Sequence, residues 1–304
     1  MALEGFGEAK PGCQHLTRQE IMALDQAALA DLLVKLSRSD PGINRLLAGL
    51  PSRQAGQKDA AEPFAEPFMV GESPAMKVVF EAIRRFALTD APVLIQGESG
   101  TGKELAAQAI HERSAFATGP FVAINCGGLP ASLIASELFV HEEGAFTGAQ
   151  QRKSGKLEAA EGGTLMLDEV GDMPLELQPH LLRFLQEMTI ERLGSNRQIR
   201  VSVHVIAATN RKLEAEVSRG RFRQDLFHRL NCLNLDVPPL RERGDDIELL
   251  ARFFAKRFSG EMGRQEKHFG ETALRALRSY HWPGNVRELI SKIRRAVVMT
   301  ASRL

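Results

Sequence analysis

The sequence predicts an α/β fold with a parallel sheet, followed by a small helical subdomain. Short apolar runs alternate with helical patterns from about residue 68 onward. Turn residues bound each run, as they bound buried strands of parallel sheets. After Pro238 and Pro239 the strand patterns stop and only helical patterns follow. These observations favour an α/β sandwich with helices behind it.

The first 64 residues differ in character from the rest. A segment that begins at Thr17 has capping-box spacing and apolar residues at helical intervals, and a second helical pattern begins at Asp40. We expect a helical N-terminal module over 1–50, with a regulatory remnant as one interpretation. Residues 51–66 are polar, contain proline and lack periodicity, which predicts a linker.

The elements of the main domain follow in order. Its strands are expected at 92–95, 121–124, 164–167 and 203–207, with helices between them. Its last helices are expected at 245–259, 271–280 and 284–300. We therefore place an α/β subdomain at 67–240 and a helical subdomain at 241–304.

Composition narrows the class of protein. The 304 residues are 43% hydrophobic and 6% aromatic, which fits one or two ordinary domains and excludes disordered, collagen-like and small disulfide-rich chains. The 39 Lys and Arg residues against 38 Asp and Glu residues leave a net charge of +1. Charge alone therefore predicts neither a nucleic-acid partner nor a membrane partner.

Neither a metal cluster nor an export signal is indicated. Cys13, Cys126 and Cys232 are far apart, and no C-x-x-C pair or histidine cluster lies near them, so reduced thiols are expected. No apolar run has the length that spans a bilayer, and the N-terminus lacks the features of a signal peptide. We expect a cytoplasmic protein that makes no membrane contact.

A glycine-rich segment follows the first expected strand and opens a helical pattern. Its residues are Gly97, Glu98, Ser99, Gly100, Thr101, Gly102, Lys103 and Glu104. The spacing G-x-x-x-x-G-K in this context indicates a phosphate-binding loop, in which backbone N–H groups surround phosphate oxygens and Lys103 reaches the β- and γ-phosphates. Glu104 replaces the usual Ser or Thr, whose hydroxyl binds Mg²⁺. A glycine-rich turn without function is the alternative, and the flanking strand and helix disfavour it.

Polar residues follow the next strands. Asp168 and Glu169 come directly after 164–167, and an ATPase needs one carboxylate at a strand end for the metal and another to polarise water. Adjacent acids are often only solvated, but the phosphate loop upstream favours catalysis. Thr209 and Asn210 follow the strand at 203–207. These two residues are interpreted either as contacts to a γ-phosphate or as a simple turn.

Arg223 and Arg229 lie six residues apart around an apolar helical pattern. Arginine from a neighbouring subunit stabilises the charge that develops during phosphoryl transfer. Solvated surface arginines are the alternative, and the spacing does not decide between the two.

These motifs, both in their residues and in their order along the chain, resemble the motifs of a known family. They are GESGTGKE (97–104), NC (125–126), SELF (136–139), GAFTGA (144–149), GGTLMLDEV (162–170), LLRFLQE (181–187), AATN (207–210), FRQDLFHRLN (222–231), PPLRERGDDI (238–247) and WPGNVREL (282–289). The central AAA+ domain of sigma-54-dependent transcriptional activators, the bacterial enhancer-binding proteins, carries similar motifs. The resemblance covers about 68–304. GAFTGA is its most specific part, because AAA+ proteins in general lack this loop.

The resemblance implies roles for the residues around the nucleotide. Lys103 would bind its phosphates, Asp168 would work with Mg²⁺, and Glu169 would polarise water. Asn125 resembles a switch residue that holds the catalytic glutamate between states. Glu104 resembles the family's own version of the phosphate loop.

Further roles follow from the later motifs. Thr209 and Asn210 match the first sensor of the family. Arg223 and Arg229 match its arginine fingers, which act on the ATP of a neighbouring subunit. Arg287 matches the second sensor, which reaches the nucleotide from the helical lid.

The resemblance also assigns contact with sigma-54 to Gly144, Ala145, Phe146, Thr147, Gly148 and Ala149. The flanking glycines suit a tight mobile tip, and an exposed Phe146 suits an anchor for a partner protein. A hairpin with Phe146 in the core is the alternative. Family members usually carry Gly-His-Glu-Lys ahead of this loop, whereas Val140 stands here in place of the glycine. Because valine disfavours a left-handed backbone, we expect a stiffer or differently shaped loop base.

Two segments that are common in the family are expected to be missing. The chain ends at Leu304, directly after the last helical pattern, which leaves no room for a helix-turn-helix that binds enhancer DNA. Its first 64 residues are too short for a phosphoacceptor domain. The chain is therefore expected either to be a fragment or to activate without direct enhancer binding.

The sequence predicts a P-loop ATPase of the AAA+ class that uses ATP and Mg²⁺ and assembles as a ring, with a hexamer expected. It would remodel the closed complex of the sigma-54 RNA polymerase holoenzyme and thereby open promoter DNA. A nucleotide-sensing regulatory module is one alternative. Val140 and the expected absence of a DNA-binding domain favour it, and the complete set of catalytic positions disfavours it. A general AAA+ remodeller is the other, which GAFTGA disfavours.

Overall fold

The computed structural model describes residues 65–66, 69–128, 130–138, 155–191, 198–265 and 268–299. The expected N-terminal module over 1–50, the GAFTGA segment and Val140 lie outside the described residues. The last two residues of the expected linker form β1 (Ala65–Glu66), which pairs antiparallel with β2 (Met69–Val70).

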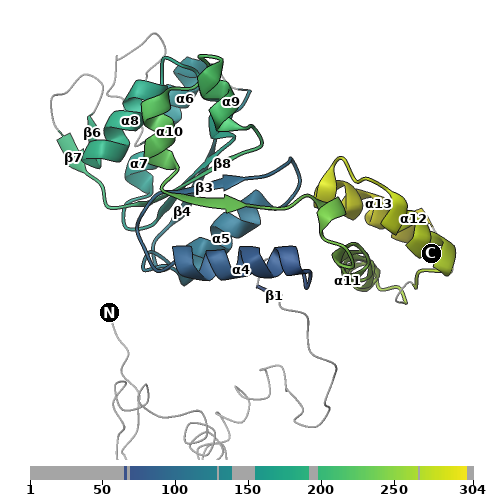
Figure 1. Cartoon of the computed structure of the whole chain (residues 1–304). Helices are drawn as coiled ribbons and strands as arrows, with labels where there is room; N and C mark the ends of the chain where they lie inside the picture. Colours follow the sequence, from purple (N-terminus) through teal and green to yellow (C-terminus); the bar gives the residue numbers. More distant parts are fainter. Residues whose placement is uncertain are drawn as a thin grey trace, which may run out of the picture. The chain divides into compact units, whose positions relative to one another are not determined.

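A five-stranded parallel sheet forms the centre of the α/β subdomain (Figure 1). Its strands, in spatial order, are β4 (Phe121–Asn125), β5 (Thr164–Asp168), β8 (His204–Thr209), β3 (Val93–Gln96) and β9 (Leu233–Asp236). The predicted α/β fold and its four strands are confirmed, with boundaries shifted by one or two residues. Strand β9 was not predicted. It lies at the sheet edge with only Leu235 buried, so it lacks the apolar run of a central strand.

Helices cover both faces of this sheet (Figure 1). One face carries α4 (Pro74–Phe86) and α5 (Lys103–Arg113). The other carries α6 (Ala131–Leu138), α7 (Lys156–Ala159), α8 (Gln178–Glu187), α9 (Leu213–Ser218) and α10 (Gln224–Leu230). The short helix η1 (Val170–Asp172) follows β5, and β6 (Thr189–Glu191) pairs antiparallel with β7 (Gln198–Arg200).

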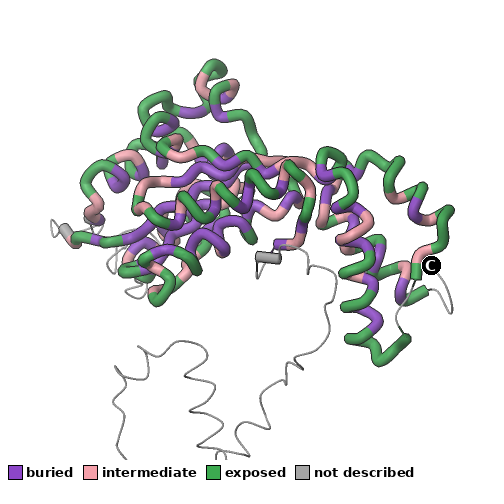
Figure 2. Tube along the Cα trace, turned by 60° about the horizontal axis from the view of Figure 1, so that its bottom comes forward, coloured by how far each residue is buried: buried purple, intermediate pink, exposed green. Residues whose placement is uncertain are grey.

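Alternate residues of the central strands supply two separate hydrophobic cores. In β5, Leu165 and Leu167 belong to the core under α6 to α10, whereas Met166 belongs to the core under α4 and α5. The neighbouring strand β8 divides in the same way. Figure 2 shows the buried trace concentrated in the strands and in the helix sides that face them. Burial on both faces explains why these strands read as continuous apolar runs.

Gly119 and Gly163, which precede β4 and β5, allow close packing. A Cβ atom at Gly163 would lie 2.0 Å from the carbonyl oxygen of Pro120, and one at Gly119 would lie 2.1 Å from that of Gly162. The chain segments that lead into β4 and β5 therefore approach each other more closely than any side chain permits.

A helical subdomain follows β9 and the short helix η2 (Leu240–Glu242). It consists of α11 (Asp246–Glu261), α12 (Glu271–Ser279) and α13 (Asn285–Met299), as predicted to within two residues at each end. Trp282 is buried in its core and donates a hydrogen bond from Nε1 to the carbonyl oxygen of Leu277 at 2.9 Å. None of the helices described has the length and apolar character to cross a membrane.

Two of the described histidines are buried, His111 in α5 and His204 at the start of β8. Nδ1 of His111 lies 2.8 Å from Oγ1 of Thr164, and Nε2 of His204 lies 3.1 Å from the carbonyl oxygen of Ala91. Burial lowers the pKa of both histidines. The nearby carboxylates of Glu112 and Asp90 oppose this effect on His111 and His204, respectively.

These histidines predict a loss of stability in mild acid. Below the unfolded-state pKa of about 6.5, the histidines of the unfolded chain bind protons that the native histidines do not bind. The free energy of unfolding therefore decreases as the pH is lowered. Thermal unfolding should show a lower midpoint at about pH 5.5 than at about pH 7.5. The double variant His111→Gln/His204→Gln should reduce this difference, whereas His281→Gln at an exposed site should preserve it. An equal pH response in both variants would assign the acid sensitivity to other groups.

Candidate active site

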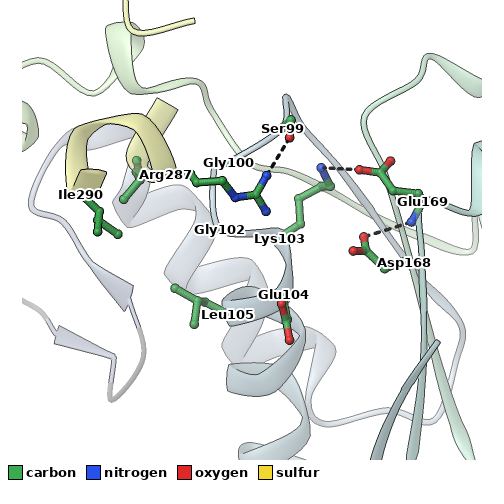
Figure 3. Close-up of a pocket in the computed structure, with 11 residues that line it drawn as sticks. Ser99, Gly100, Gly102, Lys103, Glu104, Leu105, Asp168, Glu169, Arg287 and Ile290 are labelled. Carbon is green, nitrogen blue, oxygen red and sulfur yellow. Dashed lines mark hydrogen bonds and ion pairs between the residues drawn. The ribbon is translucent and has the colours of Figure 1, made fainter. Parts of the chain in front are cut away.

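One pocket collects the phosphate loop, the carboxyl end of β5 and the first turns of α13 (Figure 3). Its volume is about 250 Å³. Its lining residues are Ser99, Gly100, Gly102, Lys103, Glu104, Leu105, Asp168, Glu169, Val286, Arg287 and Ile290. Parallel strands end at the same sheet edge, which brings groups from separate segments together there.

Lys103 begins α5 directly after Gly102, which adopts a left-handed backbone with φ of 103°. The lysine side chain is 7% exposed, and its Nζ donates hydrogen bonds to the carbonyl oxygens of Gly97 at 3.0 Å and Glu98 at 3.4 Å. Nζ also lies 3.8 Å from Oε1 of Glu169 (Figure 3). The cation is thus held inside the loop, facing the carboxylates at the end of β5.

Glu169 has a left-handed backbone with φ of 52°, which is uncommon for a residue with a side chain. Its N–H donates to Oδ1 of Asp168 at 3.0 Å, and its Oε2 accepts from the N–H of Asn210 at 3.2 Å. This sharp turn after β5 aims the carboxylate at Lys103. The sequence placed Glu169 at a strand end but carried no signal for this conformation.

The three residues compared with sensor and switch positions have different contacts. Thr209 is buried, and its Oγ1 accepts from the N–H of Arg211 at 3.1 Å. Asn125 uses its Oδ1 to accept from the N–H of Gly127 at 2.7 Å. In this structure Asn210 contacts Glu169, and Asn125 is bonded within its own loop.

Arg287 reaches the pocket from α13. Its side chain donates from Nη1 to Oγ of Ser99 at 3.0 Å (Figure 3). Its backbone N–H donates to the carbonyl oxygen of Gly100 at 3.3 Å. The helical subdomain therefore contacts the phosphate loop directly.

Arg223 and Arg229 lie elsewhere, at the start and near the end of α10. Arg223 is 45% exposed and pairs with Asp225 at 2.7 Å, which raises the pKa of the guanidinium. Arg229 donates twice to the carbonyl oxygen of Leu185, at 3.1 and 2.8 Å. Within the described part of the chain, neither arginine lines the pocket of its own subunit.

Gln178 connects the start of α10 to the residue that ends η1, the short helix after β5. It is fully buried, and its Nε2 donates to the carbonyl oxygens of Met173 and Arg221 at 3.0 and 3.1 Å. Its Oε1 accepts from the N–H of Arg223 at 2.8 Å. Sequence reasoning missed this residue, and the only available signal was a glutamine at the first turn of an otherwise apolar helix face.

Glu98 points to the helical subdomain rather than into the pocket. Its carboxylate accepts from Nη1 and Nη2 of Arg241 at 2.9 and 2.6 Å. These bonds, with another from Asn285, lower the pKa of Glu98 to about 2. The sequence had grouped Glu98 with the phosphate-binding residues without indicating this direction.

The carboxylates fit a magnesium ion that arrives with nucleotide phosphates. Among the described residues, no group of three or more His, Cys, Asp or Glu side chains could hold a metal ion. Asp168 supplies a carboxylate at the pocket beside the phosphate loop. Mg²⁺ typically binds one or two carboxylates together with substrate phosphates and water, so this donor set suits the ion only when phosphates share it.

A second, mostly apolar cavity adjoins the first. It lies between β2, α11 and α13, and it shares Gly102, Leu105, Val286 and Ile290 with the first pocket. Apolar walls with few polar groups suit a flat aromatic group such as a nucleobase.

Comparisons with known proteins agree with this geometry. The family described as "Sigma-54 interaction domain" matches residues 69–236, and "AAA+ ATPase lid domain" matches residues 241–304. Regulatory protein AtoC of Escherichia coli (strain K12) is 53% identical over 229 residues, which cover 75% of this chain and 50% of AtoC. Transcriptional regulatory protein ZraR of Klebsiella oxytoca is 47% identical over 280 residues, which cover 92% of this chain and 63% of ZraR. The chain thus spans about half to under two thirds of these relatives.

Solved structures are similar as well. NtrX from Brucella abortus in complex with ATP has a TM-score of 0.71 and 35% sequence identity, covering 90% of this chain and 57% of NtrX. A structure of NtrX in complex with ADP gives the same TM-score, identity and coverage of this chain. The predicted resemblance is therefore confirmed: this chain belongs to the sigma-54 interaction domain family of AAA+ ATPases, with the AAA+ lid domain at its end.

Proposed function

We propose that this chain hydrolyses ATP and uses the energy to remodel the sigma-54 RNA polymerase closed complex, which opens promoter DNA. The supporting observation is the convergence of Lys103, Asp168, Glu169 and Arg287 on one pocket in a member of the sigma-54 interaction domain family. The related NtrX structures contain ATP or ADP, which supports the choice of nucleotide.

Binding would begin at the phosphate loop. Backbone N–H groups of 97–104 and the N-terminus of α5 would surround the phosphates, and Lys103 would exchange its bonds to Gly97 and Glu98 for phosphate oxygens. Arg287 would approach the phosphates from the lid. The adjacent apolar cavity would hold the adenine ring.

Hydrolysis would use the turn after β5. With ATP bound, Asp168 would complete the coordination of Mg²⁺, which neutralises charge on the β- and γ-phosphates. The N–H of Asn210 would hold the carboxylate of Glu169 in place. This carboxylate would orient and polarise the attacking water. Asn125 would exchange its bond to Gly127 for one to Glu169 in another nucleotide state.

Arg223 and Arg229 would complete the site of a neighbouring subunit. Both lie outside the pocket of their own chain, and the pairing of Arg223 with Asp225 leaves it half-exposed. A site that needs a neighbour's arginine favours a closed ring, for which we propose a hexamer. We propose a cytoplasmic location, where sigma-54 polymerase acts.

Force on the polymerase would pass through Gly144 to Ala149. We infer that Phe146 and Thr147 form the contact with sigma-54, because glycines flank an apolar anchor and a hydroxyl in this segment.

The test is a native gel of this protein with purified sigma-54, using ADP and aluminium fluoride to mimic the hydrolysis transition state. We expect a complex that depends on the nucleotide and is lost in Phe146→Ala, while this variant still hydrolyses ATP. Thr147→Ala should behave in the same way. Promoter opening should be lost in both variants, because the motor turns over without contact to its target.

The two alternative functions predict other results. ATP hydrolysis without any sigma-54 complex would favour a general AAA+ remodeller. Nucleotide binding without hydrolysis, even at high protein concentration, would favour a regulatory module. Unchanged promoter opening by Phe146→Ala would contradict the proposed role of this loop.

A further inference from the structure

The lid, residues 241–304, contacts four consecutive residues of the phosphate loop. In each case a lid residue donates a hydrogen bond to an oxygen atom of the loop. The Glu98 carboxylate accepts from Arg241 and Asn285. The carbonyl oxygens of the next three residues accept from one lid residue each: Ser99 from Asn285 at 3.0 Å, Gly100 from Arg287 at 3.3 Å and Thr101 from Arg243 at 2.7 Å. We call Arg241, Arg243 and Asn285 the lid clamp.

Asn285 is the centre of the lid clamp. It is fully buried at the first position of α13 and has a left-handed backbone with φ of 51°. Its Oδ1 accepts from the N–H of Leu240 at 2.8 Å, and its Nδ2 donates to Oε2 of Glu98 at 3.1 Å and to the carbonyl oxygen of Ser99. Both donors of this amide and its acceptor are therefore in use, and they join α13, η2 and the phosphate loop.

The two arginines hold the rest of the contact. Arg241 binds Glu98 through two parallel bonds, a geometry that fixes both orientation and distance. Arg243 is only 2% exposed, and its Nη2 bridges the carbonyl oxygens of Thr101 and Pro238 at 2.7 and 2.9 Å. A buried guanidinium bound in this way ties the hinge after β9 to the loop.

The fit between the two subdomains is close at the middle of the loop. A Cβ atom at Gly100 would lie 2.5 Å from the carbonyl oxygen of Gly284, which directly precedes Asn285. Gly100 also has a positive φ of 78°. Glycine at this position therefore admits the lid as well as shaping the loop.

Peptide planarity links these contacts to phosphate binding. The C=O of one residue and the N–H of the next point in opposite directions across a trans peptide. When lid donors hold the carbonyl oxygens of Ser99 and Thr101, the N–H groups of Gly100 and Gly102 are turned away from those donors. Both glycines line the pocket.

We propose that the lid clamp, with Asn285 at its centre, positions the phosphate loop, so that the lid orients the N–H donors for the β-phosphate before nucleotide arrives. This inference rests on the nucleotide binding proposed above. Asn285, Arg241 and Arg243 act through the loop and contact no phosphate. A purely structural tie between subdomains would change stability without changing the preference for a β-phosphate.

The main test is Asn285→Asp. This change keeps an oxygen to accept from Leu240 but places a second carboxylate against Glu98 and the carbonyl oxygen of Ser99. We expect the affinity for ADP to fall about tenfold, the size of effect that one lost charge-assisted hydrogen bond produces, while the affinity for AMP changes less than about twofold. Calorimetry with ADP and AMP on the full chain measures both.

A second variant tests the same contact by rescue. In Glu98→Gln/Asn285→Asp the glutamine amide can donate a hydrogen bond to the new carboxylate. The pair then has a donor at position 98 and an acceptor at position 285, the reverse of the unmodified chain. We expect this double variant to regain at least about threefold of the lost ADP affinity, because the repulsion between the two carboxylates is removed while that with the carbonyl oxygen of Ser99 remains. Arg241→Ala should also weaken ADP binding. Arg252→Ala, which breaks an exposed arginine and glutamate pair within the lid, is the matched control and should leave it unchanged.

The possible outcomes are distinct. If the unmodified chain binds neither ADP nor ATP, the proposed function fails. If it binds ADP and Asn285→Asp binds equally well, the positioning role is overturned while the proposed function stands. Loss of ADP and AMP affinity in parallel, with a lower unfolding midpoint and no rescue by Glu98→Gln, would also overturn it, because that pattern belongs to a structural tie.

Discussion

Replacing Glu169 by glutamine is expected to lower ATP turnover by at least about a hundredfold while ATP binding persists. The amide keeps the volume of the side chain and can still face Lys103, but it cannot polarise water as a carboxylate does. The phosphate loop, Lys103 and Arg287 remain in place, so the dissociation constant for ATP should change little. Phosphate release under saturating ATP and calorimetric titration of ATP measure the two effects separately.

A suitable control is Glu214→Gln. Glu214 is an exposed glutamate in the first turn of α9, away from the residues that line the pocket. This variant should retain the turnover of the unmodified chain. If Glu169→Gln kept turnover within about tenfold, another group would have to activate the water, and the proposed role of Glu169 would be wrong.

The second large effect is expected for Arg223→Ala. An arginine supplied by a neighbour accelerates phosphoryl transfer by about 10³–10⁵-fold, so this variant should be nearly inactive by itself. The backbone N–H of Arg223 remains bonded to Gln178, so the turn before α10 should keep its shape. Arg219→Ala is the control, because Arg219 is an exposed arginine nearby that also pairs with a carboxylate.

Mixing two inactive variants tests whether Arg223 acts between subunits. An Arg223→Ala subunit retains its own Glu169 and can receive an arginine from a Glu169→Gln neighbour. In a random one-to-one ring about a quarter of the sites combine both intact groups, so turnover should recover to about that fraction. No recovery in a mixture that assembles would contradict a contribution from the neighbouring subunit.

Much of the fold was predictable because the central strands are buried on both faces. Such strands appear as short apolar runs between turn residues, and the alternation of residues between two cores follows from their geometry. Strand β9 was not predicted because an edge strand is half-exposed, and Leu-Asn-Leu-Asp resembles a turn as much as a strand. The role of Gly163 in close packing depends on Pro120, more than 40 residues earlier, and no local pattern records that distance.

The candidate site divides in a similar way. Asp168 ends one strand of the parallel sheet, Glu169 follows it and Lys103 follows another, so their common edge could be inferred from strand order along the chain. The left-handed backbone of Glu169 was not predictable, because it depends on contacts with Asp168 and Asn210. Gln178 gave no signal, since its three bonds connect segments that lie far apart in sequence.

The sequence by itself determined the α/β class, the phosphate loop, the two carboxylates and the family, because each depends on residues at fixed short spacing. The tertiary structure alone decided that Glu98 faces the lid, that Asn285 joins three segments, and that Arg223 lies outside the pocket of its own chain. These contacts connect residues up to 187 positions apart, and their geometry depends on how the lid packs against the sheet edge. Local sequence patterns carry no record of such packing, so only the folded chain brings these groups together.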